Sequence, residues 1–501
     1  MNKALTGPAL VIATIAVALA TFLIVLDYSI ANVSLPYIAG DLAVSADQGI
    51  YVITSFAIGS AIILPVSGWL TKRLGLIRLM LLSLMGFTLL SFVCGISQNI
   101  AMLVIARFLQ GMAAGPLVPL SQSIIVMIFP PAKKATALAF WSTVTVTAPI
   151  LGPILGGWIC YDYSWPWIFF INVPLGLFSW IAIRALLKGY DTERVSQPTD
   201  WVGLILLAIG VSTLQFMLDK GQQYDWMHSP IIRTCAVASA LAFFTLIPWE
   251  LRHRTPLLEL SLLKIRSYTL SIVFIAVAYA IYFGSVVLIP LWLQQNMGYT
   301  PTWAGLAVAP IGILPFLFSN LIGTWVKKRG SITPLLLSFF MFALSCFATA
   351  FLTTAVDIWH IGFSRFLLGA GLLLFIVPLF SLSIQEIPSE KLPSATGMFH
   401  FVRAMVGAIG TSLFTTLWER RTIYHSSIVG ANVSEFQQPT RDALATLAQQ
   451  GLQGEQAHGV LYELVNQQSA LLAINDCFYV MGWIFLALSL VLILGRKRAT
   501  V

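Results

Sequence analysis

The chain of 501 residues is 58% hydrophobic and only 10% charged, with a formal net charge of +8. A soluble globular domain carries about 25% charged residues, so most of the surface of this protein cannot face water. In a soluble protein the positive charge would suggest an acidic partner. Here a bias of Lys and Arg toward one side of a membrane explains the charge better, and nucleic acid is not implied.

Apolar runs of about 20 residues recur along the chain, and a helix of that length crosses a hydrocarbon core. We therefore predict an all-α integral membrane protein with fourteen transmembrane helices. The predicted spans are residues 10–32, 50–71, 77–97, 102–128, 135–160, 166–187, 201–219, 231–250, 268–293, 303–326, 332–353, 358–380, 395–418 and 471–495.

The distribution of basic residues predicts the orientation of these spans. With both termini placed in the cytoplasm, most of the 28 Lys and Arg fall on the inner side, as the positive-inside rule requires. The first span resembles a signal peptide, but its apolar stretch is longer than a signal core and further spans follow at once. The five cysteines lie in or beside spans without metal-ligand spacing, which favours small apolar filler over a metal site.

An internal repeat relates the two ends of the chain. The sequence R-F-L-Q-G at 107–111 recurs as R-F-L-L-G at 365–369, and G-W-L-T-K-R-L-G at 68–75 matches G-T-W-V-K-K-R-G at 323–330. Repeats with a binding site between them are a common plan of secondary transporters. We predict two six-helix halves separated by two inserted helices, with boundaries at 1–190, 191–266 and 267–501.

One long polar stretch, residues 419–470, separates the last two spans on the predicted outer side. It forms either a lid packed on the protein's own outer face or a docking surface for another protein, and both interpretations stay open. Apolar residues at helical spacing predict short amphipathic helices within it, namely Leu444, Leu447, Val460, Leu461 and Leu464.

Asp27 is the one acidic residue that we place deep in a predicted span. A carboxylate inside a membrane is costly, and it can gain and lose a proton as its surroundings change. Arg107 lies at a similar predicted depth, so the two can meet, and Gln110 one turn further on can join them. We expect Asp27 to carry protons in exchange with its pairing to Arg107. A permanent, purely structural salt bridge explains the same residues almost as well.

The second half carries no equivalent acid. Arg365 is the repeat partner of Arg107, but the position equivalent to Asp27 falls near Ile281, so proton handling is expected to be asymmetric. His400 and Arg403, in the thirteenth span, are candidates to face a substrate cavity. A histidine in such a span is more often a satisfied polar residue than a member of a proton relay.

The fifth span carries the small-residue face A-P-I-L-G-P-I-L-G-G at 148–157. Gly152 and Gly156 allow another helix to approach closely, and Pro153 bends the span, with Gly157 beside them. Packing alone is a sufficient explanation of this pattern.

Aromatic residues supply further candidates for a substrate cavity, namely Trp141, Tyr279 and Phe283. Sequence patterns of nucleotide-binding loops, serine hydrolases and zinc proteases are absent from the chain. We therefore expect a transporter rather than an enzyme, with no cofactor and no metal.

Five motifs together resemble the fourteen-helix drug:proton antiporters of the major facilitator superfamily, and among them the EmrB-type multidrug pumps. The sequence L-D-Y-S-I-A-N-V-S-L-P at 26–36 resembles the signature of their first helix. Residues 68–78 resemble the loop motif between the second and third helices, and 107–115 the motif of the fourth. Residues 148–157 resemble the antiporter motif of the fifth helix, and 165–176 a further hallmark of the group.

The resemblance implies roles for the residues that carry these motifs. It implies a major facilitator fold, substrate contacts from Tyr28 and Asn32, and a gating loop formed by Gly68, Lys72, Arg73, Gly75 and Arg78. One position departs from the family pattern. Lys72 stands where most of the superfamily has an aspartate, so the usual acid of the inner gate is absent, and Thr71 cannot replace its charge.

The resemblance also implies proton-coupled efflux of hydrophobic or cationic drugs across the bacterial inner membrane, by alternating access. The partners would be a periplasmic adaptor (EmrA-like), which we expect to contact 419–470, and an outer-membrane channel (TolC-like), in a three-part pump. The nearest alternative is a proton-coupled exporter of one physiological compound, such as a siderophore, fatty acid or bile salt. A passive channel is disfavoured by the repeat, and a membrane sensor or scaffold is a further alternative.

Overall fold

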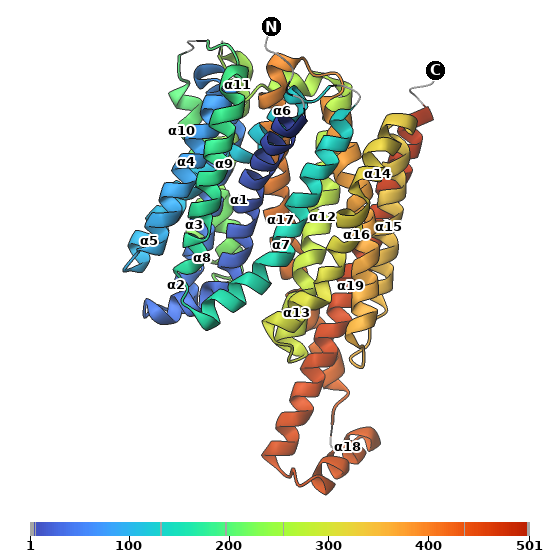
Figure 1. Cartoon of the computed structure of the whole chain (residues 1–501). Coiled ribbons are helices and arrows are strands. Elements are labelled where there is room, and N and C mark those ends of the chain that lie inside the picture. The colour runs from blue at the N-terminus through green and yellow to red at the C-terminus, as the bar shows by residue number, and fades with distance from the viewer. Residues whose placement is uncertain are drawn as a thin grey trace. The chain divides into compact units, whose positions relative to one another are not determined.

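The computed structural model describes residues 5, 7–130, 133–195, 198–253, 255–434 and 436–497, and every regular element among them is a helix (Figure 1). Twelve helices in this described part are long and apolar enough to cross a membrane. The other two predicted spans fall on α7 and on the stretch from α13 to α14. All fourteen predicted spans therefore coincide with helical segments.

The first eleven α-helices cover the segment up to the end of the predicted insertion. They are α1 (Gly7–Asp41), α2 (Ala46–Gly49), α3 (Tyr51–Leu74), α4 (Leu76–Gly95), α5 (Ile100–Ala114), α6 (Leu117–Ile128), α7 (Lys134–Asp162), α8 (Trp167–Phe170), α9 (Asn172–Leu187), α10 (Trp201–Lys220) and α11 (Pro230–Arg252), with the 3-10 turns η2 (Lys188–Tyr190) and η3 (Trp226–His228).

The remaining elements include the two longest helices of the chain. They are α12 (Arg266–Asn296), α13 (Pro301–Val308), α14 (Ile313–Arg329), α15 (Ile332–Ala350), α16 (Ile358–Ile384), α17 (Leu392–Ala431), α18 (Gln438–Gln449) and α19 (Glu455–Lys497), with the 3-10 turns η4 (Leu260–Lys264), η5 (Ala309–Gly312) and η6 (Ser389–Lys391).

Two predicted spans are interrupted at a proline, and a third, 166–187, is divided into α8 and α9 at Ile171. The span at 102–128 is divided into α5 and α6 at Gly115 and Pro116, and the span at 303–326 changes to the 3-10 turn η5 around Pro310. Proline has no backbone N–H and its ring clashes with the preceding turn, which explains the breaks at Pro116 and around Pro310.

The chain packs as two compact units. The first comprises Met1–Tyr279, Leu314–Leu335 and Leu373–Ala408, and the second comprises the intervening segments and the C-terminal part of the chain from Ile409. Because both units take segments from beyond residue 267, they do not follow the boundaries predicted from the repeat. The two six-helix halves with an insertion therefore stay a prediction.

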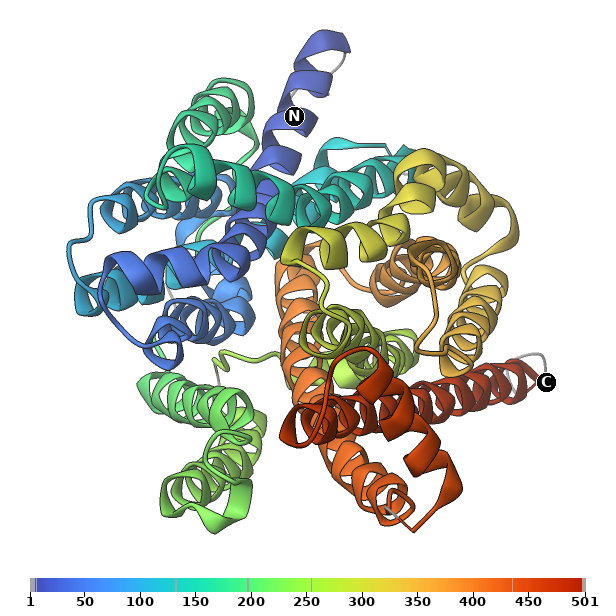
Figure 2. The same cartoon turned by 90° about the horizontal axis from the view of Figure 1, so that it is seen from below.

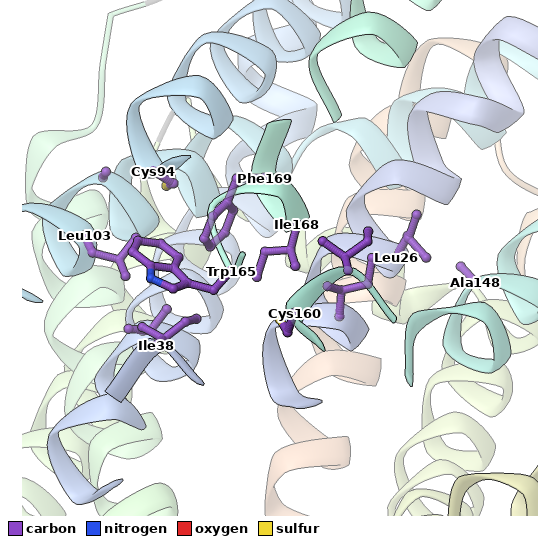
Figure 3. Packing of buried hydrophobic residues seen from close by; sticks show 13 residues of the cluster. Leu26, Ile38, Cys94, Leu103, Ala148, Cys160, Trp165, Ile168 and Phe169 are labelled. Atoms are coloured by element: carbon purple, nitrogen blue, oxygen red, sulfur yellow. The ribbon is translucent and has the colours of Figure 1, made fainter. Parts of the chain in front are cut away.

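Within the first unit, one apolar cluster joins α1, α3, α4, α5, α7 and α8. Figure 3 shows Trp165 near Leu103 and Ile38, and Phe169 near Cys94, in this cluster. The Trp165 indole donates a hydrogen bond of 2.7 Å to Asp41 Oδ2 at the end of α1, which satisfies its one polar atom. The cluster includes side chains of α1 and α5, the two helices that carry the candidate proton site.

The inserted helices α10 and α11 also belong to the first unit and pack against each other (Figure 2). Leu207 of α10 and Leu246 of α11 share an apolar cluster with Val66 and Trp69 of α3. The cluster also takes in Leu257, which follows α11, so the connection after the insertion is held on the same surface.

The outer stretch differs from its predicted form. Its short amphipathic helix exists as α18, but most of the stretch consists of continuations of the spanning helices α17 and α19, which have 40 and 43 residues. At 1.5 Å per residue each helix is about 60 Å long, roughly twice the thickness of a hydrocarbon core. In the second unit these ends and α18 form a projection, hereafter the outer extension (Figure 1).

Candidate functional site

The candidate site is centred on an ion pair between α1 and α5. Arg107 Nη1 donates to Asp27 Oδ2 at 2.5 Å, and both side chains are buried. An isolated charge in so dry a place would be very costly, so each group compensates the other. The two residues that the sequence paired by depth are therefore in direct contact.

Two side-chain amides complete the shell of the carboxylate. Asn172, at the start of α9, donates to Asp27 Oδ1 at 2.9 Å, and Gln110 donates to the same oxygen at 3.4 Å. Gln110 also accepts from Arg107 Nη1 at 2.8 Å, so it touches both ions. Asn172 further donates to Ser91 Oγ on α4 at 3.0 Å. The carboxylate thus has charged and neutral donors from two helices, α5 and α9.

Arg107 is held by its remaining surroundings as well. Its Nε donates to the carbonyl oxygen of Val52 at 3.2 Å, and its guanidinium lies 4.3 Å from the ring centre of Phe56 and 5.4 Å from that of Phe169. Among the described residues, the buried Nη2 atom has no hydrogen-bond partner. The Nη2 group of Arg107 is therefore available to donate to another acceptor. The guanidinium also lies beside two aromatic rings, whose faces attract a cation.

Glycine places α5 against α3 at this site. A Cβ atom at Gly111 would lie 2.2 Å from the carbonyl oxygen of Phe56, and a Cβ atom at Gly59 would lie 2.2 Å from that of Phe108. No larger residue allows the two backbones to approach so closely. Gly111 follows Gln110 directly, so the close contact fixes the depth at which Arg107 and Gln110 face α1.

The small-residue face of α7 packs on α1 next to Asp27. A Cβ atom at Gly152 would lie 2.3 Å from Ser29 Oγ, and one at Gly156 would lie 3.3 Å from Ile30. Gly157 instead faces open space. The side chain of Pro153 lies outside the described ones. The motif therefore brings α7 against the turn of α1 that follows Asp27.

A second buried polar group in the first unit contains two of the predicted cavity residues. Trp141 Nε1 donates to Ser121 Oγ at 3.0 Å and to Thr21 Oγ1 at 3.2 Å. His400 Nε2 lies 2.6 Å from Gln122 Oε1, and its ring is 6.3 Å from that of Trp141. Trp141 and His400 are both buried, so they contribute to packing between helices in this conformation.

The other predicted substrate residues have different surroundings. Arg403 lies over the ring of Tyr279 at 5.5 Å, and both are partly buried. Tyr28 and Asn32 are exposed, and Asn32 Nδ2 donates to the carbonyl oxygen of Tyr28 on its own helix. Phe283 belongs to the second unit. The structure does not gather the whole predicted set into one cavity.

The loop between α3 and α4 holds the start of the insertion. Gly75 has a φ of 90°, and a Cβ atom there would lie 2.5 Å from the carboxylate of Asp191. That carboxylate accepts from the N–H of Ile77 at 2.9 Å, at the first turn of α4. Arg73 donates to Thr199 at 2.6 Å. The segment after α9 is therefore tied to this loop at several points.

The other two basic residues of this loop motif, Lys72 and Arg78, lie in different surroundings. Lys72 forms an ion pair with Glu259, which follows α11. Arg78 lies one turn into α4. Gly68, in the C-terminal part of α3, would place a Cβ atom 2.3 Å from Ser394 Oγ on α17. The loop motif thus brings α3 into close contact with the start of α17 within the first unit.

Sequence reasoning did not identify two residues at these sites. Asn172 stood inside the motif at 165–176 without a role, although its position two residues before a proline at a helix start is a signal of a capping or polar site. Glu259 lies in the connection between α11 and α12, and no sequence pattern there predicted which residues it contacts. Among the described residues there is no group of three or more His, Cys, Asp or Glu that could hold a metal ion.

Comparison with known proteins places this geometry in a family. The family model of the Major Facilitator Superfamily matches residues 17–411. The multidrug export protein EmrB of Escherichia coli (strain K12) is 41% identical over 488 residues, which cover 97% of this chain and 95% of EmrB. The fatty acid resistance protein FarB of Neisseria gonorrhoeae is 39% identical over 485 residues, which cover 97% of this chain and 96% of FarB.

Solved structures support the fold. The crystal structure of tetrameric PepTSo2 has a TM-score of 0.60 at 14% identity, and the match covers 98% of this chain and 100% of the PepTSo2 chain. The human organic anion transporter MFSD10 (TETRAN) has a TM-score of 0.57 at 13% identity, with coverage of 96% and 100%. With the buried Asp27–Arg107 pair on helices of the matched region, these findings show that the chain belongs to the Major Facilitator Superfamily, in the family that includes EmrB.

Proposed function

We propose that the protein exports hydrophobic or cationic drugs in exchange for protons, across the bacterial inner membrane and with both termini in the cytoplasm. The observation that carries this proposal is the buried Asp27–Arg107 pair with its amide donors, because a titratable carboxylate inside a membrane is a proton-site candidate by default. The likeness to the multidrug export protein EmrB, over nearly the whole of both chains, supports the substrate class.

The ion pair gives a physical route to proton coupling. A proton taken up by Asp27 from the outside removes the negative charge and weakens the bond to Arg107. The guanidinium then needs another partner, and the rings of Phe56 and Phe169 beside it offer the face of an aromatic surface. Proton uptake and drug binding thus compete through the same few side chains, so that uptake of the proton releases the drug.

Alternating access completes the cycle. The two predicted halves rock so that the site opens to each side in turn, as in other transporters built from repeats. Loss of the proton to the cytoplasm restores the carboxylate and its pairing with Arg107. One proton that crosses a potential of 100 mV supplies about 2.3 kcal/mol, which supports a drug gradient of roughly fiftyfold when fully coupled.

A narrow-substrate exporter is the second candidate. The observation in its favour is the likeness to FarB, a fatty acid resistance protein, at nearly the same identity as to EmrB. A susceptibility panel in cells that lack other pumps distinguishes the two. Protection against several unrelated drugs supports multidrug export, whereas protection against fatty acids alone would establish the narrower function.

The outer extension is where we expect a partner to bind. Arg421 on α17 and Asp476 on α19 form an ion pair of 2.5 Å at its base, which holds the two long helices together. Further out, Phe436 is 92% exposed and Ile423 and Tyr462 are also exposed. Apolar side chains in water mark an interaction surface. We propose that an EmrA-like periplasmic adaptor binds here and connects the transporter to a TolC-like outer-membrane channel.

Proton movement driven by a lipophilic cationic dye tests the function. In inside-out vesicles, we expect the dye to dissipate an imposed proton gradient for the wild type and not for Asp27→Asn at matched expression. Asp442→Asn is the control, because Asp442 lies on α18 in the outer extension and accepts a hydrogen bond from Gln438 of its own helix. It should behave as the wild type does.

Each other result has a distinct meaning. If Asp27→Asn responds as the wild type does, the proton site lies elsewhere and the Asp27–Arg107 pair is structural. If neither responds while the fatty acid panel is positive, the narrow-substrate exporter replaces the multidrug proposal.

A further inference from the structure

The inserted helices hold an acidic residue against a lysine of the gating loop. Glu259, in the connection after α11, forms an ion pair with Lys72 at the end of α3. Its other carboxylate oxygen, Oε2, lies 3.3 Å from Nζ of Lys391, directly before α17. One carboxylate thus bridges two lysines that are 319 residues apart in the sequence. The side chain of Glu259 is 10% exposed, so it depends on both partners more than a surface acid does.

The first partner, Lys72, connects Glu259 to α3. The connection that carries Glu259 is fixed to α11, because the N–H of Leu258 donates to Glu250 Oε2 at 3.2 Å. Leu257 and Leu258 pack in the apolar cluster of α3, α10 and α11. Glu259 is therefore seated on α3 through both its ion pair and the apolar residues that precede it.

The second partner, Lys391, belongs to a segment that packs closely on α3 and α6. A Cβ atom at Gly68 would lie 2.3 Å from Ser394 Oγ, and one at Gly397 would lie 2.4 Å from Ser67 Oγ. Ser123 Oγ on α6 is 3.1 Å from Thr396 Oγ1. The first turns of α17 must leave this contact if α17 is to separate from α3 and α6, and the Lys391–Glu259 pair would then break.

We propose that Glu259 is the acid of the inner gate, and that the inserted helices supply it because position 72 carries a base. Lys72 positions Glu259 and stays paired with it throughout the cycle. Lys391 binds Glu259 when the gate is closed and leaves it when the gate opens. This inference rests on the proposed alternating access, and it assigns a function to the two helices inserted between the halves.

Accessibility of the contact between α6 and α17 tests the gate directly. Ser123→Cys, in a chain whose five native cysteines are replaced, reports the opening through its reaction with a membrane-impermeant maleimide added to inside-out vesicles. Ser123 is buried in the closed contact, so reaction should be slow. Glu259→Gln should raise the labelling rate up to about fivefold, the range that a partly exposed ion pair contributes. Glu390→Gln is the matched control, because Glu390 is exposed and next to Lys391.

Charge reversal separates a latch from a general loss of folding. Lys391→Glu alone should open the gate as Glu259→Gln does, because it places two acids together. The triple variant Lys72→Glu, Glu259→Lys and Lys391→Glu restores both pairs with opposite signs and should return labelling to near the wild-type rate. If Glu259→Gln fails to insert, Lys391→Gln takes its place, since it removes the bridging contact alone.

Two results would overturn the proposal. Either Glu259→Gln and Lys391→Glu label at the wild-type rate, or the triple variant labels as fast as the single variants. The measurement uses neither drug nor proton gradient. A chain that fails to move protons with a drug, and so contradicts the proposed function, would therefore still show whether Glu259 closes this contact.

Discussion

The two repeat-related arginines, Arg107 and Arg365, are both fully buried, but their surroundings differ in kind. Arg107, in the first unit, meets the carboxylate of Asp27 and the amide of Gln110. Arg365, in the second unit, donates to Thr349 Oγ1 at 2.5 Å and to the carbonyl oxygen of Ser285 at 3.2 Å, and lies over the ring of Phe478. In the part of the chain that the structure describes, Arg365 has no ion-paired carboxylate.

This difference separates the elements that both repeat sites share from the one element found in a single site. Gly111 and Gly369 both follow the arginine by four residues, and both touch a backbone carbonyl, at Phe56 and at Ile311. The arginine and the glycine are therefore common to both sites, as parts of the packing. Among the described residues the acid occurs in one site alone. Ser285, which precedes Arg365 by 80 residues as Asp27 precedes Arg107, offers a backbone carbonyl in the second site, and the predicted position Ile281 lies one turn before it. Among the described residues, a carboxylate paired with the repeat arginine occurs only in the first unit.

The largest expected effect comes from removal of Arg107. Arg107→Met leaves Asp27 buried without its cation, which should lower the free energy of unfolding by about 3–5 kcal/mol. Arg365→Met removes hydrogen bonds from the guanidinium to uncharged acceptors and should cost about 1–3 kcal/mol. Unfolding in mixed micelles with rising SDS measures both. The double variant Asp27→Asn and Arg107→Met should recover part of the loss, because no buried charge remains.

Transfer of the acid to the second unit is the next test. Ile281 lies one turn before Ser285, whose carbonyl oxygen binds Arg365. Ile281→Asp should therefore find a cation within reach, whereas Leu293→Asp, at an equally buried position of α12, should not. We expect Ile281→Asp to be the more stable variant by about 2 kcal/mol, within the range of buried pairs. Equal losses for both would contradict the view that Arg365 lacks only an acid.

Asn172→Leu should have an intermediate effect. It removes the donor to Asp27 Oδ1 and to Ser91, and an unsatisfied buried polar group costs about 1–3 kcal/mol. The same vesicle assay that reports Asp27 should show slower dye-driven proton movement. Unchanged proton movement at reduced stability would make Asn172 a packing residue rather than part of the proton site.

The sequence was sufficient to predict helices, motifs and the pairing of Asp27 with Arg107. Long apolar runs determine spans almost without competition, because a membrane leaves the backbone no other way to satisfy its hydrogen bonds. The shared depth of the two residues made their contact foreseeable. This signal was available because both ions lie inside helices of regular rise.

Contacts made by connections could not be predicted in the same way. Glu259 and Asp191 meet the gating loop through segments without periodicity, so nothing in the sequence indicated their partners. The predicted form of the outer stretch was wrong. We interpreted the polar residues at 419–431 and 455–470 as parts of a connection between spans, although a helix can continue into water. Hydropathy reports where a membrane ends, and it does not report where a helix ends.

The smallest expected effect concerns an acid of the second unit that stands in water. Asp357 directly precedes α16, which carries Arg365, and accepts from the N–H of His360 at 3.1 Å. Hydrogen bonds from His360 hold the pKa of Asp357 below its usual value of 3.8. A lowered pKa stabilises the folded state above the unfolded pKa, and this contribution is lost as the pH falls through the folded pKa.

Asp357→Asn should therefore be slightly less stable than the wild type at pH 7, and the difference should disappear only below about pH 4. Dye-driven proton movement should be unchanged, because the carboxylate is exposed and stays charged throughout the working range. Unfolding curves at pH 7 and pH 3 measure the first effect, and the vesicle assay measures the second. A loss of proton coupling in Asp357→Asn would break the comparison between the two arginines, because the second unit would then contribute its own acid from the helix that carries Arg365.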